Sequence, residues 1–189
     1  MIRLMSHDMF KDFLCSLRDA SLPDSKDDKQ LPHVTDSNII AINFDKATAE
    51  YSAKFKLKSN EHNPKSSDSV YQHSDGDIYL VEFKSSKPSG SKKDGVKLKP
   101  LESLLTFMDI FREVDRDYAR LHITFVLVFS EKLSVRERGR SDKLSNTNQP
   151  EIIYCGLERL KGVYFKNVIT KSASDFAIYI TEQGWTSMV

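Results

Sequence analysis

IYLVEFK, at residues 78–84, is the stretch of this sequence on which the expected fold depends. Its aliphatic and aromatic residues are typical of a strand inside a sheet. Because side chains alternate between the two faces of a strand, Glu82 and Lys84 share the face of Ile78 and Leu80. Buried charges are costly unless they pair or bind a metal, so the stretch predicts a polar site at the rim of an apolar layer.

A second strand-like run precedes this one at residues 68–73, and the two are separated by Ser74-Asp75-Gly76. That tripeptide is typical of a hairpin turn, since Gly76 can adopt positive φ. We therefore expect residues 68–73 and 77–83 to pair as an antiparallel hairpin.

The length of the turn decides which residues of the hairpin face each other. With a three-residue loop, His73 pairs with Asp77, and counting back along both strands places Asp68 opposite Glu82. Two carboxylates side by side repel each other unless a cation lies between them, and Mg²⁺ or Mn²⁺ suits such oxygen ligands. A two-residue loop would instead place Ser69 opposite Glu82.

The rest of the chain has an α/β pattern. Apolar spacing predicts two helices before the hairpin and one after it, followed by a near-continuous apolar run that is typical of a strand buried on both faces. This order predicts a mixed β-sheet flanked by helices. The expected ranges are helices at 7–17, 38–58 and 100–118, strands at 122–129, 151–154 and 162–168, and either a helix or a strand at 176–181.

Asp68, the hairpin, and Glu82-Phe83-Lys84 at the end of an apolar strand resemble the signature of the PD-(D/E)XK nuclease superfamily. In that family the two acids hold Mg²⁺ (or Mn²⁺), and the lysine positions or activates the attacking water. The resemblance implies that Asp68, Glu82 and the backbone carbonyl of Phe83 are metal ligands and that Lys84 is catalytic. It also implies a catalytic role for Glu50, on the preceding helix.

The resemblance implies a restriction-endonuclease-like core over about residues 38–130. The chain would then be one nuclease-like domain, residues 1–189, with an N-terminal helix and a C-terminal α/β extension. The implied function is a Mg²⁺-dependent nuclease that hydrolyses phosphodiester bonds in DNA or RNA, in a bacterial or phage defence setting. The alternative is a non-catalytic protein- or nucleic-acid-binding module on the same fold, such as an immunity, inhibitor or assembly factor.

A basic segment begins at the end of the second hairpin strand. Residues 84–99 contain six lysines and one acid, and such a segment can contact the phosphates of a nucleic acid without reading its sequence. A protein partner or a homodimer is left open by the sequence. The expected nucleic-acid-binding residues are Lys87, Lys92, Lys93, Lys97 and Lys99.

Composition and length exclude several classes of protein. Aromatic residues make up 10% of the chain, which supplies area to bury and argues against wholesale disorder. No apolar run approaches the roughly 20 residues that span a bilayer, and the N-terminal residues lack the apolar region of a signal peptide. Cys15 and Cys155 are the only cysteines and predict neither a disulfide framework nor a zinc site. We therefore expect a cytoplasmic protein.

Overall fold

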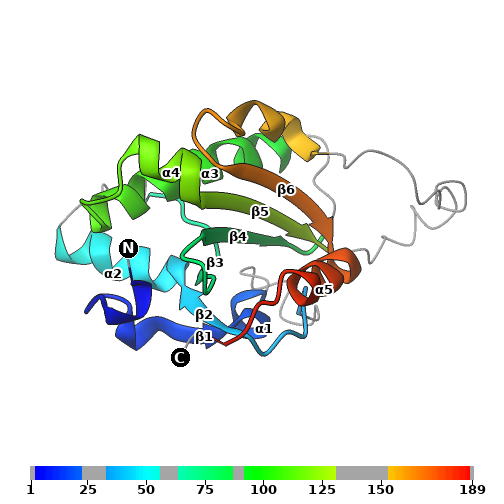
Figure 1. Cartoon of the computed structure of the whole chain (residues 1–189), viewed down its shortest axis with the longest axis horizontal. Coiled ribbons are helices and arrows are strands. Elements are labelled where there is room, and N and C mark those ends of the chain that lie inside the picture. The colour runs from blue at the N-terminus through cyan, green and yellow to red at the C-terminus, as the bar shows by residue number, and fades with distance from the viewer. Residues whose placement is uncertain (1–2, 23–32, 56–63, 87–91, 131–152, 188–189) are drawn as a thin grey trace, which may run out of the picture.

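The computed structural model describes residues 3–22, 33–55, 64–86, 92–130 and 153–187. Within these ranges the chain forms a six-stranded mixed sheet, with strands in the order β1-β2-β3-β4-β5-β6 (Figure 1). Pairs from β1 to β4 are antiparallel, and β5 lies parallel to both β4 and β6. The strands are β1 (Leu14–Ser16), β2 (Ile40–Asn43), β3 (Ser69–Gln72), β4 (Ile78–Lys84), β5 (Ile123–Phe129) and β6 (Asn167–Ser172).

Helices pack on both faces of this sheet, so the expected α/β architecture with a mixed sheet is confirmed. Alternation along the strands divides the apolar residues between two cores. Leu80 lies in the first core, with residues of α2, α3 and α4, and its neighbour Val81 lies in the second, with residues of α1 and α5. The helices are α1 (Leu17–Ala20), α2 (Phe44–Lys54), α3 (Lys92–Ile110), α4 (Arg116–His122) and α5 (Ala173–Glu182), with 3₁₀ helices at Leu4–Ser6, Lys11–Phe13 and Tyr154–Leu160.

The predicted hairpin and its register are confirmed. His73 donates its backbone N–H to Asp77 at 2.8 Å, and Gly76 has a φ of 94°, which only glycine adopts readily. Val70 pairs with Leu80 in β4, as the three-residue loop requires. The predicted strand at 122–129 is also confirmed, because β5 is buried over nearly all its length beside β4.

The expected helix at 7–17 is wrong. The segment forms a 3₁₀ turn and then β1, whose Cys15 pairs with Ala41 of β2. Its apolar spacing fits a helix, but only Phe10 and Leu17 are fully buried, in different cores. The spacing therefore reflects two separate burial sites and not one helical face.

The expected helix at 38–58 begins later than predicted. Residues Ile40–Asn43 form β2 between β1 and β3, and the helix begins only at Phe44. The side chain of Asn43 accepts a hydrogen bond from the backbone N–H of Lys46 at 2.9 Å, so Asn43 caps α2. Residues 56–58 lie outside the described part of the chain.

The single helix expected at 100–118 is two helices in the structure. The first, α3, begins before Pro100 and ends at Ile110. Asp115 then accepts a hydrogen bond from the backbone N–H of Tyr118 at 2.7 Å and caps α4. The apolar pattern continues across the break, which explains why the sequence did not reveal it.

The C-terminal strand begins later than expected. Residues 162–165 form a turn in which Gly162 has a φ of 72°, and β6 starts at Asn167 instead of at 162. The ambiguous segment 176–181 lies inside α5, which Ser172 caps by accepting a hydrogen bond from the N–H of Asp175. The short strand expected at 151–154 is not formed at its described end, because Tyr154 begins a 3₁₀ helix, and residues 151–152 lie outside the described part.

Among the helices that the structure describes, none is long and apolar enough to cross a membrane.

Trp185 closes the second core against the back of the hairpin. Its ring stacks on Tyr71 of β3 at 4.1 Å and meets Phe176 of α5 edge-on, and the residue is 6% exposed. We predict that Trp185→Ala lowers the free energy of unfolding by about 3–5 kcal/mol, because it leaves a cavity in this core. Urea denaturation measures the loss. Leu105→Ala, at a side chain that is 65% exposed, should change the free energy by less than about 0.5 kcal/mol.

Candidate functional site

Asp68 and Glu82 lie side by side at the end of the hairpin. Ser69 pairs with Val81 in the ladder, so the next pair outward is Asp68 with Glu82, on the face of the first core. Glu82 is completely buried, and Asp68 is 9% exposed. Asp68 also accepts a hydrogen bond from the backbone N–H of Phe83 at 2.5 Å. The register thus brings two buried carboxylates to one point.

Lys99 of α3 lies across both carboxylates. Its ammonium is 3.3 Å from Asp68 Oδ1 and 2.8 Å from each carboxylate oxygen of Glu82. Only Oε1 of Glu82 receives a hydrogen bond, so the buried Oε2 is close to the cation but accepts none from any described group. The Lys99 side chain is 15% exposed. The sequence predicted Lys99 as a nucleic-acid contact and did not reveal this position.

Lys84 contacts the same site from the rim. Its ammonium lies 2.5 Å from Glu82 Oε1, and its side chain is 34% exposed. The alternation predicted for β4 is therefore observed, since Glu82 and Lys84 lie on the face of Leu80. Glu82 is paired with two lysines, of which Lys84 is the more exposed to solvent.

Burial and charge change the proton affinities in this site. Burial, the charge of Glu82 and the charge of Asp45 raise the pKa of Asp68 well above its ordinary value, although Lys99 and the N–H of Phe83 oppose the shift. Burial alone lowers the pKa of Lys99, but the carboxylates of Asp68, Glu82 and Asp45 together raise that pKa above its ordinary value. The Lys99 ammonium is therefore charged at neutral pH.

Asp45, and not Glu50, is the helical acid in the electrostatic environment of this pair. Glu50 is exposed on α2, whereas Asp45 lies in the first turn of α2, whose first residue, Phe44, donates its N–H to the carbonyl of Asp68. Asp45 also accepts a hydrogen bond from Ser66. The expected helix at 38–58 hid this position, because it placed residue 45 in the third turn and not in the first.

Contacts with the segment before β3 hold α3 over the site. Glu102 accepts a hydrogen bond from the backbone N–H of Lys65 at 2.9 Å, and the hydroxyl of Ser67 lies 3.0 Å from that of Ser103, with both serines fully buried. Glu102 and Ser103 follow Lys99 by about one helical turn. These contacts therefore fix the part of α3 from which the Lys99 side chain starts.

The oxygens of the site fit a hard divalent cation. In an antiparallel ladder, the N–H and C=O of one residue point to the same side. Since the N–H of Phe83 meets Asp68, and the carbonyl of Lys84 accepts from Ser130 on the β5 side, the carbonyl of Phe83 lies on the β3 side of the strand. Two carboxylates and a carbonyl are ligands that Mg²⁺ and Mn²⁺ accept. The site offers two acidic side chains and one carbonyl. A group of three His, Cys, Asp or Glu residues that could hold a metal does not occur in the described part of the chain.

The other acids of the hairpin are engaged at its opposite end. Asp77 forms an ion pair with Lys166 and lies 3.5 Å from Nδ1 of His122, and Asp75 lies 2.9 Å from Nδ1 of His73. These contacts lie around the turn, whereas the candidate site lies at the other end of β4. They leave Asp68 and Glu82 as the acids of the site.

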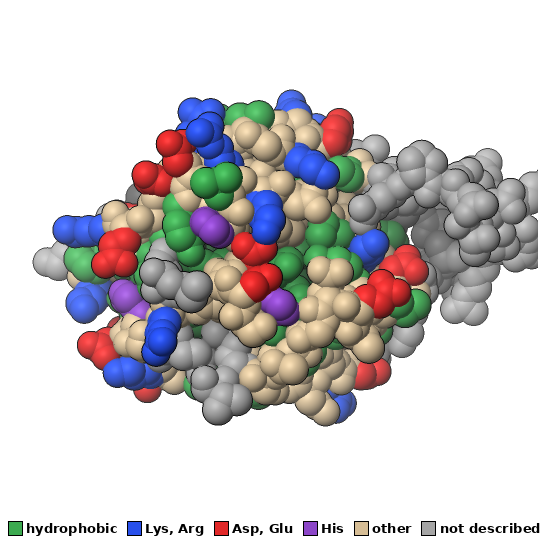
Figure 2. Space-filling view, viewed as in Figure 1, with side chains coloured by type: hydrophobic (Ala, Val, Ile, Leu, Met, Phe, Trp, Pro, Cys, Tyr) green, Lys and Arg blue, Asp and Glu red, His purple; other side chains and the backbone are tan. Residues whose placement is uncertain are grey.

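Of the expected nucleic-acid-binding lysines, the structure describes the side chains of Lys97 and Lys99. Lys97 is half-buried beside Leu101 and Tyr164, and Lys99 lies in the acidic pair. Lys92 and Lys93 fall in the first turn of α3, and Lys87 falls outside the described residues. Figure 2 shows basic, acidic and histidine side chains interspersed on the face it displays, without one large patch of a single sign.

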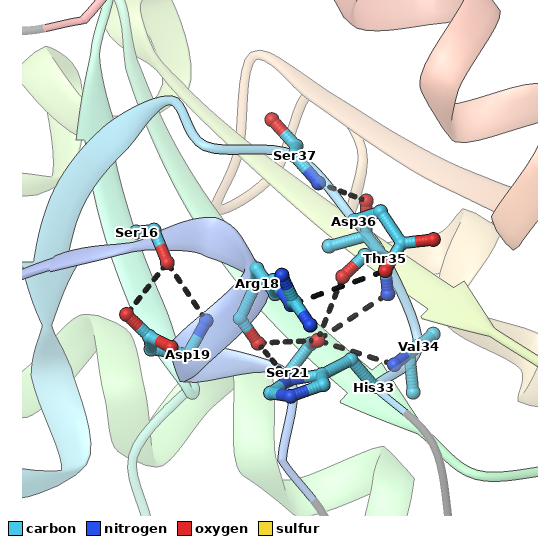
Figure 3. A network of polar contacts seen from close by, with 9 residues as sticks. All are labelled: Ser16, Arg18, Asp19, Ser21, His33, Val34, Thr35, Asp36 and Ser37. Carbon is cyan, nitrogen blue, oxygen red and sulfur yellow. Dashed lines mark hydrogen bonds and ion pairs between the residues drawn. The ribbon is translucent and has the colours of Figure 1, made fainter.

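A separate polar network is structural. Ser21 accepts hydrogen bonds from the backbone N–H groups of Val34 and Thr35 at 3.1 and 3.3 Å and donates to the carbonyl of Arg18 (Figure 3). His33 also contacts that carbonyl through its ring nitrogen at 2.7 Å. The network joins residues 33–35 to the end of α1.

The raised pKa of Asp68 predicts a pH-dependent stability. The folded protein holds this proton at pH values where the unfolded chain has released it, so the free energy of unfolding falls as pH rises from the ordinary pKa of 3.8 through the raised value. We predict that Asp68→Asn, which keeps an acceptor for the N–H of Phe83, reduces this decline. Urea unfolding in chelator between about pH 4 and pH 8 measures it. The exposed Asp12→Asn serves as control, and an unchanged decline in Asp68→Asn would contradict the prediction.

Comparisons with protein-family models, with curated proteins and with solved structures found no match to this chain.

Proposed function

We propose that the protein is a metal-dependent nuclease that hydrolyses phosphodiester bonds in DNA or RNA, with a site of the PD-(D/E)XK type. The observation that carries the proposal is the adjacency of the buried Asp68 and Glu82 at the end of the hairpin, with Lys84 in contact with Glu82. This arrangement brings two acids and a lysine together on one face of the sheet.

Each residue of the site has a chemical role in this proposal. Asp68, Glu82 and the carbonyl of Phe83 would hold Mg²⁺ or Mn²⁺. A bound ion of this kind lowers the pKa of water and stabilises charge on a phosphoryl oxygen. Lys84, which is one-third exposed at the rim, would position the attacking water and stabilise the negative charge that develops on the phosphate.

The order of elements supports a restriction-endonuclease-like core. The site lies at the end of β4, where the hairpin leads into the segment before α3, and β5 returns parallel to β4 after two helices. Ligands of α/β sheets commonly bind at the carboxyl ends of parallel strands, and Glu82 and Lys84 occupy that end of β4.

One observation favours a non-catalytic binding module instead. Lys99 already compensates the charges of Asp68 and Glu82, so the pair is satisfied in part without a metal. A buried group of acids and lysines can be retained for structure alone. Cleavage of nucleic acid distinguishes the two functions. A nuclease would cleave its substrate with the help of Lys84, whereas a binding module would cleave nothing.

The test is a cleavage assay on single- and double-stranded DNA and RNA, with Mg²⁺, with Mn²⁺ and with EDTA. We predict metal-dependent cleavage that Lys84→Ala and Glu82→Gln each reduce by at least about 100-fold, because they remove charge stabilisation and a metal ligand. Lys161→Ala, at an exposed lysine outside the site, should cleave like the wild type.

Full activity in Lys84→Ala or in Glu82→Gln would contradict the proposed site. A folded protein that binds nucleic acid or another protein but cuts none of the substrates would instead support the binding module. Circular dichroism of each variant confirms that a loss of activity is not a loss of fold.

A further inference from the structure

Lys99 occupies the space between two carboxylates that the proposed function assigns to a metal. Its ammonium lies within 3.3 Å of Asp68 Oδ1 and of both oxygens of Glu82. These are the oxygens that a divalent ion would have to contact at roughly 2.1 Å. An ammonium and a divalent ion cannot share that position, both for lack of space and because they repel each other.

The ammonium satisfies the acids only in part. Oε2 of Glu82 is buried and close to Lys99, yet it accepts no hydrogen bond from any described residue. A divalent ion has no fixed hydrogen directions and carries twice the charge of the ammonium, so it would interact with Oε2 as well as with Oε1. Charge and ligand type therefore favour competition between the ammonium and a divalent ion for the same oxygens.

The position of Lys99 is built into the fold. The contacts of Glu102 with Lys65 and of Ser103 with Ser67 fasten α3 beside the site, so the lysine stem starts from a fixed point. The side chain itself has four flexible carbons and can withdraw without moving the helix. Lys99 can thus leave the pair while the backbone around the site stays in place.

We propose that Lys99 is an internal counter-cation of Asp68 and Glu82 which a divalent ion must displace in order to bind. This inference rests on the proposed function for the identity of the ion. It makes Lys99 a positioning residue that sets how much free metal the site requires. Lys84, which contacts Oε1 of Glu82 and is more exposed than Lys99, is not the residue to be displaced in this proposal.

The test is a titration of the full chain with Mn²⁺, in which electron paramagnetic resonance reports the free ion. We predict that Lys99→Met binds Mn²⁺ at least about 10-fold more tightly than the wild type, because the competing cation is gone. Lys99→Arg keeps a cation and should stay near the wild-type affinity. Lys46→Met removes an exposed lysine from α2 and serves as the matched control.

Thermal unfolding gives a second measurement. In EDTA, Lys99→Met should unfold at a lower temperature than the wild type, since two carboxylates lose their partner. Mn²⁺ should raise the unfolding temperature of the variant more than that of the wild type. If Lys99→Met does not fold, Lys99→Gln, which keeps a polar side chain of similar length, takes its place in both measurements.

Equal or weaker Mn²⁺ binding in these variants would overturn the inference, as would tight binding that survives Glu82→Gln in the Lys99→Met background. Tighter binding without cleavage by any of the proteins would support the inference and refute the nuclease. Cleavage by the wild type with unchanged Mn²⁺ affinity in Lys99→Met would refute the inference alone.

Discussion

Burial of the Glu82 carboxylate is the constraint on which the arrangement around it depends. The side chain has no exposure to water, and its strand is buried from Ile78 to Phe83. A charge in such a place needs partners. Lys84 of the same strand and Lys99 of α3 supply positive charge. Asp68 adds a second carboxylate, which increases the need for positive charge at the site. The site therefore consists of two carboxylates and two ammonium groups of opposite charge beside an apolar layer.

The hairpin and its register could be predicted because local sequence determines them. Gly76 fixes the turn, the turn fixes the pairing, and the pairing brings Asp68 to Glu82. The alternation of β4 likewise predicts that Glu82 and Lys84 share a face. None of these steps requires knowledge of what packs against the hairpin.

The residues that could not be predicted depend on contacts distant in sequence. The role of Lys99 follows from how α3 lies over the segment before β3, and no local pattern reports that packing. Asp45 was missed for a related reason. Ile40–Asn43 forms a strand because β1 and β3 lie on both sides of it, so the position where α2 begins is set by the sheet.

The second core has a consequence for the chemistry on the opposite face. Tyr71 stacks on Trp185, and its hydroxyl donates to the carbonyl of Thr186 at 3.0 Å. The C-terminal segment therefore packs on the face of the hairpin that belongs to the second core. Residues 68, 82 and 99 take no part in that packing. The contacts that support the hairpin from its second face therefore come from a different part of the chain than the contacts that hold α3, and with it Lys99, beside the site.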